Sequence, residues 1–259
     1  MIFLLLAFFL VTYLSSRNHL ISHLTVHRAD VSCAILLRTL PSFKPTLYLV
    51  DEDLLPTPPP TTLSQRLYPL TSSSNFAQTL SDLYSRLHQL TLFLTSASTN
   101  AFDDILFSDK LDILQRHIID IMHSQSLAAA PDVAFLTAFL NACLIYIYGE
   151  LRQVSPYTRL CVVLASRISS GLEMMDLESL LLQRDGVGDL VVWTLVVGRS
   201  VAEGRDGIWF RRRIVEVEDA VGKQGEFLAI ISHRCFLYFY IYVDLCISCV
   251  DTGADILNR

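Results

Sequence analysis

Positive charge is scarce in this sequence of 259 residues. Lys and Arg together number 20 against 26 Asp and Glu, so the formal net charge is −6 at pH 7. Proteins that hold nucleic acid do so mostly by neutralising phosphates with Lys and Arg. The only basic cluster runs from Arg211 to Arg213, and Arg212 stands four residues before Glu216, a spacing typical of a solvated helix face. We therefore expect no direct nucleic-acid binding by this chain.

Enzyme signatures are also missing. The sequence contains no G-x-S-x-G nucleophile elbow and no P-loop. The stretch GVGDLV at residues 186–191 lacks the third glycine and the preceding strand of a dinucleotide-binding loop. Acidic pairs such as Asp103 and Asp104 stand in predicted loops without a partner base. We expect a protein that is not an enzyme and that has neither catalytic residues nor a cofactor.

The histidines near the N-terminus have a spacing that a metal site can use. His19, His23 and His27 recur at every fourth position, which would align their rings on one helix face. No H-E-x-x-H pattern is present, and Leu20 and Leu24 give the same helix a separate apolar face. We interpret the segment as an amphipathic helix with a polar face, and we expect no metal.

The six cysteines do not have the spacing of a metal or redox site. Cys33, Cys143 and Cys161 stand singly among apolar neighbours, which is typical of free buried cysteines in a reducing compartment. Cys246 and Cys249 form one C-x-x-C, but no second pair and no nearby histidine accompany it. We interpret this pair as small apolar residues in a hydrophobic tail.

Both ends of the chain are apolar. The run from Ile2 to Leu14 lacks a basic n-region and an A-x-A-like cleavage site, and it is shorter than the ~20 residues that span a bilayer. A buried core helix, a signal or anchor, and a mispredicted gene start remain open for it. The aromatic and β-branched stretch from Cys235 to Val250 is a final buried helix, a membrane-associating segment or a translated intron. A membrane protein anchored by these two segments is therefore the alternative to a nuclear or cytosolic one.

The middle of the chain predicts an all-α fold, a multi-helix bundle. Phe76, Leu80, Leu83 and Leu87 recur at steps of four and three, as in an amphipathic helix. The stretch VAFLTAFLNACLIYIY at residues 133–148 is apolar nearly all round and too short for a comfortable membrane span, which predicts the central buried helix. Ser155 suits the N-cap of a following helix.

Composition divides the chain into four parts. They are an N-terminal helical segment (residues 1–50), a Pro/Ser/Thr-rich linker (51–75), a helical domain (76–221) and an atypical apolar C-terminal extension (222–259). Proline restricts the chain to extended or turn conformations, and Ser and Thr supply little surface to bury. The linker is therefore expected to be a loop that separates an N-terminal helical hairpin from the main bundle.

The stretch DLVVWTLVVGRSVAEGRDGIWF, residues 189–210, has the start and stop signals of a helix. Asp189 suits its N-cap, and Gly204 suits the C′ position, where a left-handed residue is favoured. Gly198 inside the helix costs up to about 1 kcal/mol relative to Ala, so we expect a close helix crossing there. Trp209 and Phe210 begin a further helix and are expected to be core residues rather than a ligand cage.

Two stretches in succession, FLNACLIYIYGELRQVSP and LVVWTLVVGRSVAEGRDGIWF, resemble the fungal-specific transcription-factor regulatory domain. Members of that family show an apolar helix ending in L-W or V-W, a glycine step, A-A-E and then W-F. The likeness covers roughly residues 27–218, with Arg199 in place of a second glycine, Val201 in place of an alanine, and Ile208 where a charged residue is frequent. The matching motif residues are Trp193, Gly198, Ala202, Glu203, Trp209 and Phe210.

The resemblance implies a regulatory role. The family's DNA-binding module is a compact cluster of six cysteines with interleaved Lys and Arg, whereas the six cysteines here are spread from Cys33 to Cys249. The resemblance therefore implies a regulatory domain without its own DNA-reading module. Such a protein is expected in the nucleus or cytosol, where it acts through protein partners or an unidentified small effector.

Overall fold

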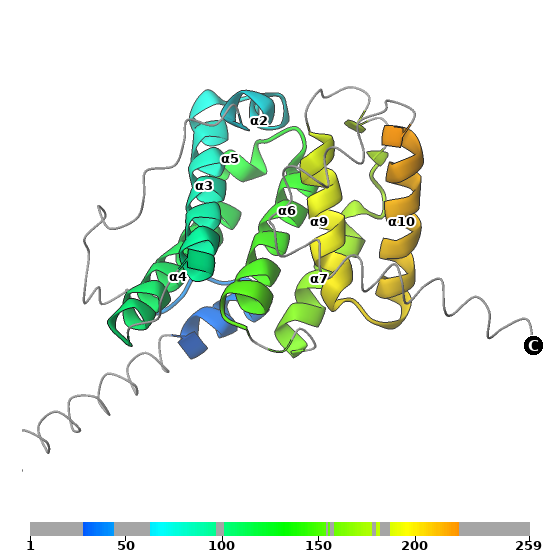
Figure 1. Ribbon diagram of the computed structural model, residues 1–259. Coiled ribbons are helices and arrows are strands. Elements are labelled where there is room, and N and C mark those ends of the chain that lie inside the picture. Colours follow the sequence, from blue (N-terminus) through cyan, green and yellow to red (C-terminus); the bar gives the residue numbers. More distant parts are fainter. Residues whose placement is uncertain are drawn as a thin grey trace, which may run out of the picture.

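The computed structural model describes residues 28–43, 63–96, 101–153, 155, 158–177, 180–181 and 187–222 (Figure 1). Within these ranges every regular element is a helix, so the predicted all-α multi-helix bundle is confirmed. The predictions for the apolar ends (residues 2–14 and 235–250) and for the histidine repeat (His19, His23 and His27) concern residues outside these ranges.

The helices follow one another with short connections. A helix at residues 28–37 comes first. It is followed by α2 (Leu63–Thr71), α3 (Ser74–Ser96), α4 (Ala101–Met122), α5 (Gln125–Ala128), α6 (Val133–Tyr146), the π-helical turn η2 (Ile147–Leu151), α7 (Arg159–Leu172), α9 (Gly188–Val201) and α10 (Gly204–Gly222). Figure 1 shows α3 and α4 on one side of α6, and α9 and α10 on the other.

Helix α6 is the centre of the bundle, as its sequence predicts. It packs against α4, α7 and α9, and all of its residues from Phe135 to Tyr146 except Thr137 are buried. The continuous helix Val133–Leu151 is long and apolar enough to cross a membrane by length and composition alone, with a mean hydropathy of 1.5. In the bundle 72% of it is buried by the neighbouring helices, as in the core helix of a soluble protein.

The expected loop at residues 51–75 is wrong in its second half. Residues 63–71 form α2, and α3 already begins at Ser74. Leu67 and Leu70 are both 0% exposed, and α2 packs on α3. Pro69 lies inside α2 although it lacks the N–H that a helix interior uses, so burial of the two leucines outweighs this local penalty.

The expected separation of an N-terminal segment from the bundle is also wrong for residues 28–43. Val31, Ala34 and Ile35 belong to the same hydrophobic core as α6. These three positions define the inner face of the helix at residues 28–37, so Cys33, which was expected to be buried, is exposed. Cys143 is buried as expected, and so is Cys161.

Candidate ligand-binding pocket

The six motif residues come together where α9 meets α10 and α6. Trp193 is 4% exposed, and its ring centroid lies 5.6 Å from that of Phe139 and 5.9 Å from that of Tyr146, both on α6. Trp209 and Phe210 form an edge-to-face pair with centroids 5.0 Å apart. Glu203 is exposed in the turn between α9 and α10. The aromatic members of the motif are therefore packed side chains of an interhelical corner.

Gly198 allows the close crossing that the sequence predicts. A Cβ added at this glycine would lie 2.4 Å from Cζ of Phe210, so the Phe210 ring occupies the space that any other residue would fill. Gly204 has a φ of +52°, as expected for a left-handed residue. It stands two positions after the C-cap Ala202, one residue later than predicted. Asp189 is not the N-cap: the cap is Val187, and α9 begins at Gly188.

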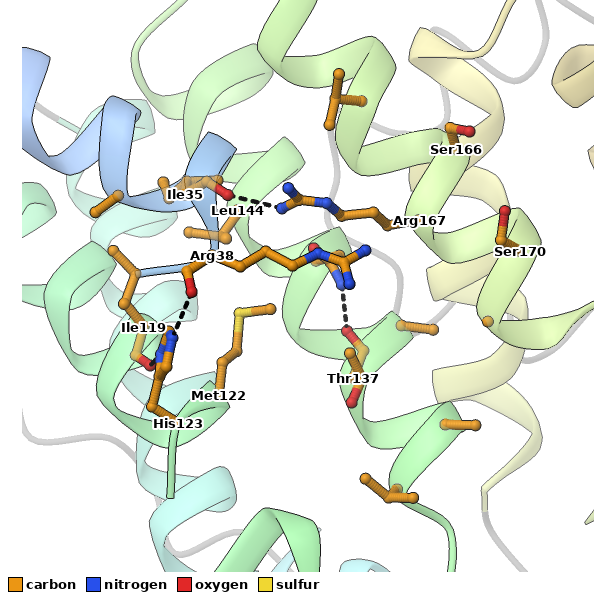
Figure 2. Close-up of a pocket in the computed structure, with 17 residues that line it drawn as sticks. Ile35, Arg38, Ile119, Met122, His123, Thr137, Leu144, Ser166, Arg167 and Ser170 are labelled. Carbon is orange, nitrogen blue, oxygen red and sulfur yellow. Dashed lines mark hydrogen bonds between the residues drawn. The ribbon is translucent and has the colours of Figure 1, made fainter. Parts of the chain in front are cut away.

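A cavity of about 770 Å³ lies elsewhere, between the helix at residues 28–37, α4, α6 and α7. None of the six motif residues lines it. Its polar lining includes Arg38, His123, Thr137, Asn141 and Arg167, and Figure 2 shows these side chains around it. We refer to this cavity as the Arg38 pocket. Its volume falls in the range that holds small-molecule ligands, about 300–1,000 Å³.

Arg38 has a backbone conformation that is unusual for its residue type. Its φ is +56°, in the left-handed region, and the N–H of Thr39 donates to the carbonyl oxygen of Ala34 at 3.0 Å. This pair makes Arg38 the C′ residue of a Schellman motif, a position where glycine is preferred because it has no Cβ. The turn directs the Arg38 guanidinium across the pocket toward α6, where Thr137 lies (Figure 2).

Two neighbouring side chains hold this turn in place. Arg167 on α7 donates to the carbonyl oxygens of Ile35 at 2.7 Å and Leu36 at 2.8 Å, which are at the end of the helix. His123 places Nε2 3.1 Å from the carbonyl oxygen of Arg38. Burial lowers the pKa of Arg167, and the positive charge of Arg38 lowers it further. Two guanidinium groups therefore act on one another at this site.

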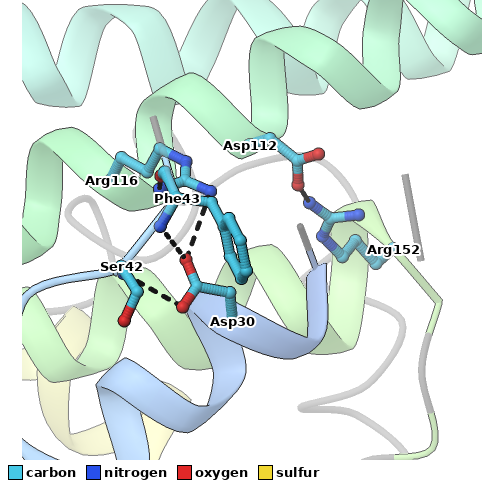
Figure 3. A network of polar contacts seen from close by, with 6 residues as sticks. All are labelled: Asp30, Ser42, Phe43, Asp112, Arg116 and Arg152. Atoms are coloured by element: carbon cyan, nitrogen blue, oxygen red, sulfur yellow. Dashed lines mark hydrogen bonds and ion pairs between the residues drawn. The ribbon is translucent and has the colours of Figure 1, made fainter. Parts of the chain in front are cut away.

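The chain after Arg38 is fixed by an acidic residue of the same helix. Asp30 accepts hydrogen bonds from the backbone N–H groups of Ser42 and Phe43, both at 3.0 Å (Figure 3). Arg116 on α4 donates to the carbonyl oxygen of Phe43 at 2.6 Å and lies 3.8 Å from the Asp30 carboxylate. The turn that carries Arg38 is therefore held on both sides and is preorganised.

Asn141 supplies an acceptor at the inner wall of the pocket. It is 1% exposed, and its Nδ2 donates to the carbonyl oxygen of Thr137 at 2.7 Å. Its Oδ1 has no hydrogen-bond partner among the described residues. A buried amide oxygen without a partner is uncommon, because leaving it unpaired costs about 1–3 kcal/mol. Asn141 therefore offers an acceptor for a donor group.

A second cavity, of about 270 Å³, has its charges paired by the protein itself. Arg152 forms an ion pair with Asp112, seen in Figure 3, and donates to Oε1 of Gln115 at 2.9 Å. The hydroxyls of Ser32 and Tyr148 lie 3.0 Å apart across the same cavity. These contacts join the helix at residues 28–37 to α4 and to the region of η2. This cavity therefore reads as a polar seam that holds helices together.

Sequence reasoning did not identify the Arg38 pocket. Arg38 and Arg167 lie on helices far apart in the chain, and neither belongs to a motif. The one local signal was Thr137 and Asn141, the only polar residues that interrupt the apolar stretch of α6. Within the described ranges, no group of three or more His, Cys, Asp or Glu is placed to hold a metal ion.

No protein-family model matches the chain, and neither a curated protein nor a solved structure resembles it significantly.

Proposed function

We propose that this chain is a regulatory protein that resembles the fungal-specific transcription-factor regulatory domain and acts without its own DNA-binding module. In this proposal it works through protein partners and through a small effector. The nucleus or the cytosol is the proposed location. The pocket's arginine and amide groups serve to bind an effector, and no catalytic step is proposed for them.

One observation carries the proposal: a preorganised pocket with polar groups lies inside a helical bundle whose motif residues form a separate, packed corner. The motif corner of Trp193, Gly198 and Phe210 gives α9 and α10 a fixed contact with the core. The Arg38 pocket joins the first described helix to α4, α6 and α7. A ligand that bridges several helices stabilises one arrangement of the bundle, which is how binding is converted into a regulatory signal.

The proposal is tested by tethering the full chain to a promoter. The chain is fused to an unrelated DNA-binding module in a yeast reporter strain, and reporter output is compared with that of the module alone. We expect the fusion to change the output in either direction. A matched fusion carrying Trp193→Ala, which opens the motif corner, should lose the effect. Output equal to that of the module alone, at equal protein abundance, would overturn the proposal.

A further inference from the structure

The Arg38 pocket concentrates positive charge in a protein whose net charge is negative. Arg38 and Arg167 both line it, and no Asp or Glu is among its described lining residues. The formal net charge of the whole chain is −6, so this clustering is not a consequence of a generally basic composition. Two like charges in one cavity repel each other, and an anion placed between them removes that repulsion.

The backbone at Arg38 supports a binding role for its side chain. Glycine would adopt φ near +56° without strain, yet the position carries the largest basic side chain. The guanidinium is exposed, and it forms no ion pair or hydrogen bond with the part of the chain that the structure describes. Strained residues of this kind persist where the conformation serves a site. Arg38 is therefore available for a ligand.

The walls of the pocket specify what accompanies the negative charge. Most of the lining is apolar, with Ile35, Met122, Val133, Leu144 and Val163 around the polar groups. Asn141 adds the unpaired acceptor Oδ1. A ligand that matches these features has a planar anionic head for a guanidinium, a hydroxyl or amine donor for Asn141, and a hydrocarbon body. Inorganic phosphate lacks the third feature.

We propose that the Arg38 pocket binds a small organic carboxylate that carries a hydrogen-bond donor and an apolar body. The carboxylate pairs with Arg38 in bidentate fashion, with Arg167 adding positive charge, and the donor reaches Asn141. The inference deepens the proposed regulatory function, because it names the chemical class of the effector, and its biological meaning rests on that function. The binding itself is measured separately.

The test uses the full chain and three 2-hydroxy acids of increasing size: lactate, 2-hydroxy-4-methylpentanoate and 3-phenyllactate. Binding is followed by calorimetric titration and by the midpoint of thermal unfolding. At least the two larger acids should bind with a Kd of about 1 mM or lower. Three analogues remove one feature each: 3-phenyllactamide has no charge, 3-phenylpropanoate has no hydroxyl, and inorganic phosphate has no apolar body. Each should bind at least about tenfold more weakly than 3-phenyllactate.

The variants assign the binding to the proposed residues. Arg38→Gln removes the charge and should weaken 3-phenyllactate binding about tenfold or more. Arg38→Gly should do the same while it relaxes the turn, so its lost affinity cannot come from a damaged fold. Arg205→Gln is the matched control, because Arg205 is 90% exposed and lies outside the pocket, and it should leave affinity within about twofold. Asn141→Leu should remove the preference for 3-phenyllactate over 3-phenylpropanoate.

Three results would overturn the inference: no binding of any of the three acids at 10 mM (about −2.7 kcal/mol at most), equal binding of the acid and its amide, or equal binding by the Arg38→Gln variant. Phosphate that binds as tightly as the acids would show a general anion site and overturn the carboxylate assignment. A negative titration together with an active reporter fusion would reject the ligand and leave the proposed function standing. Binding together with a silent fusion would do the reverse.

Discussion

The ring of Phe210 occupies the space beside Gly198, so that an added Cβ on Gly198 would lie 2.4 Å from Cζ and 2.5 Å from Cε1 of that ring. Phe210 is 0% exposed, and the ring has no open space to move into without displacing its neighbours. The contact locks α10 onto α9 at the centre of the motif corner. It also explains why a helix interior contains a glycine that weakens the helix.

Gly198→Ala should therefore destabilise the protein, although alanine is the better helix former. Overpacking a core costs about 1–3 kcal/mol, and the gain in helix propensity returns up to about 1 kcal/mol, so we expect a net loss of roughly 1–2 kcal/mol. The midpoint of urea unfolding at unchanged slope measures it. Gly149→Ala is the control, because a Cβ there meets nothing within 4 Å, and it should be neutral or slightly stabilising.

A double variant separates this clash from other effects of the glycine. Phe210→Leu removes the ring atom that the new Cβ would meet. If the clash is the cause, the losses of Gly198→Ala and Phe210→Leu should be less than additive by at least about 0.5 kcal/mol. Strict additivity would mean that the alanine acts through the backbone and not through Phe210.

Arg38→Gly should make the protein more stable. A left-handed conformation costs an L-residue about 1–2 kcal/mol, and the larger backbone entropy of unfolded glycine takes back part of the gain, so we expect an increase of about 0.5–1 kcal/mol. Gln153 has a φ of +51° directly after η2 and its C-cap, and Gln153→Gly should give a similar increase. Only Arg38→Gly should also weaken carboxylate binding. A loss of stability in Arg38→Gly alone would show that the arginine side chain supports the fold.

The sequence predicted features that depend on local periodicity or on glycine geometry. The buried α6 follows from a run with only Thr137 and Asn141 as polar residues, and the close crossing follows from Gly198. The caps were less predictable, because several residues near a helix start can accept the same hydrogen bond. Ser155 was expected to cap α7, but Thr158 does so by accepting from the N–H of Cys161 at 3.5 Å.

Features that depend on distant residues could not be read from the chain. Pro69 and the neighbouring Ser and Thr residues favour a loop, and only the packing of Leu67 on α3 makes α2 a helix. The Arg38 pocket depends on a Schellman turn without glycine, for which the sequence around Arg38 gives no signal. Its second arginine, Arg167, comes from α7 and is positioned by the tertiary fold alone.

The pair of Arg152 and Asp112 should contribute far more to stability than an exposed ion pair. Their side chains are only 9% and 11% exposed, so Asp112→Ala leaves a buried guanidinium without its carboxylate. We expect a loss of about 3 kcal/mol or more in urea unfolding. Glu216→Ala removes the same charge from an exposed contact with Arg213 and should cost less than about 1 kcal/mol. Similar losses in the two variants would mean that water solvates Arg152 in the second cavity.

Asp109 should weaken the folded state at neutral pH. Burial raises the pKa of its carboxyl, and the negative charge of Asp112 raises it further, while Arg28 opposes both effects. Because the folded pKa lies above the ordinary value of 3.8, the folded state favours the protonated form, and stability from this group is lost as the pH rises through the folded pKa. Asp109→Asn imitates the neutral form.

The thermal midpoint of Asp109→Asn should therefore exceed that of the parent chain at pH 7, and the difference should shrink as the pH falls toward 3.8. Glu216→Gln is the control, because it removes one negative charge from an exposed position on α10 and should show no such convergence. If Asp109→Asn lowers the midpoint at pH 7, the carboxylate is stabilised by Arg28 more than it is destabilised by burial and Asp112, and its folded pKa lies below the ordinary value.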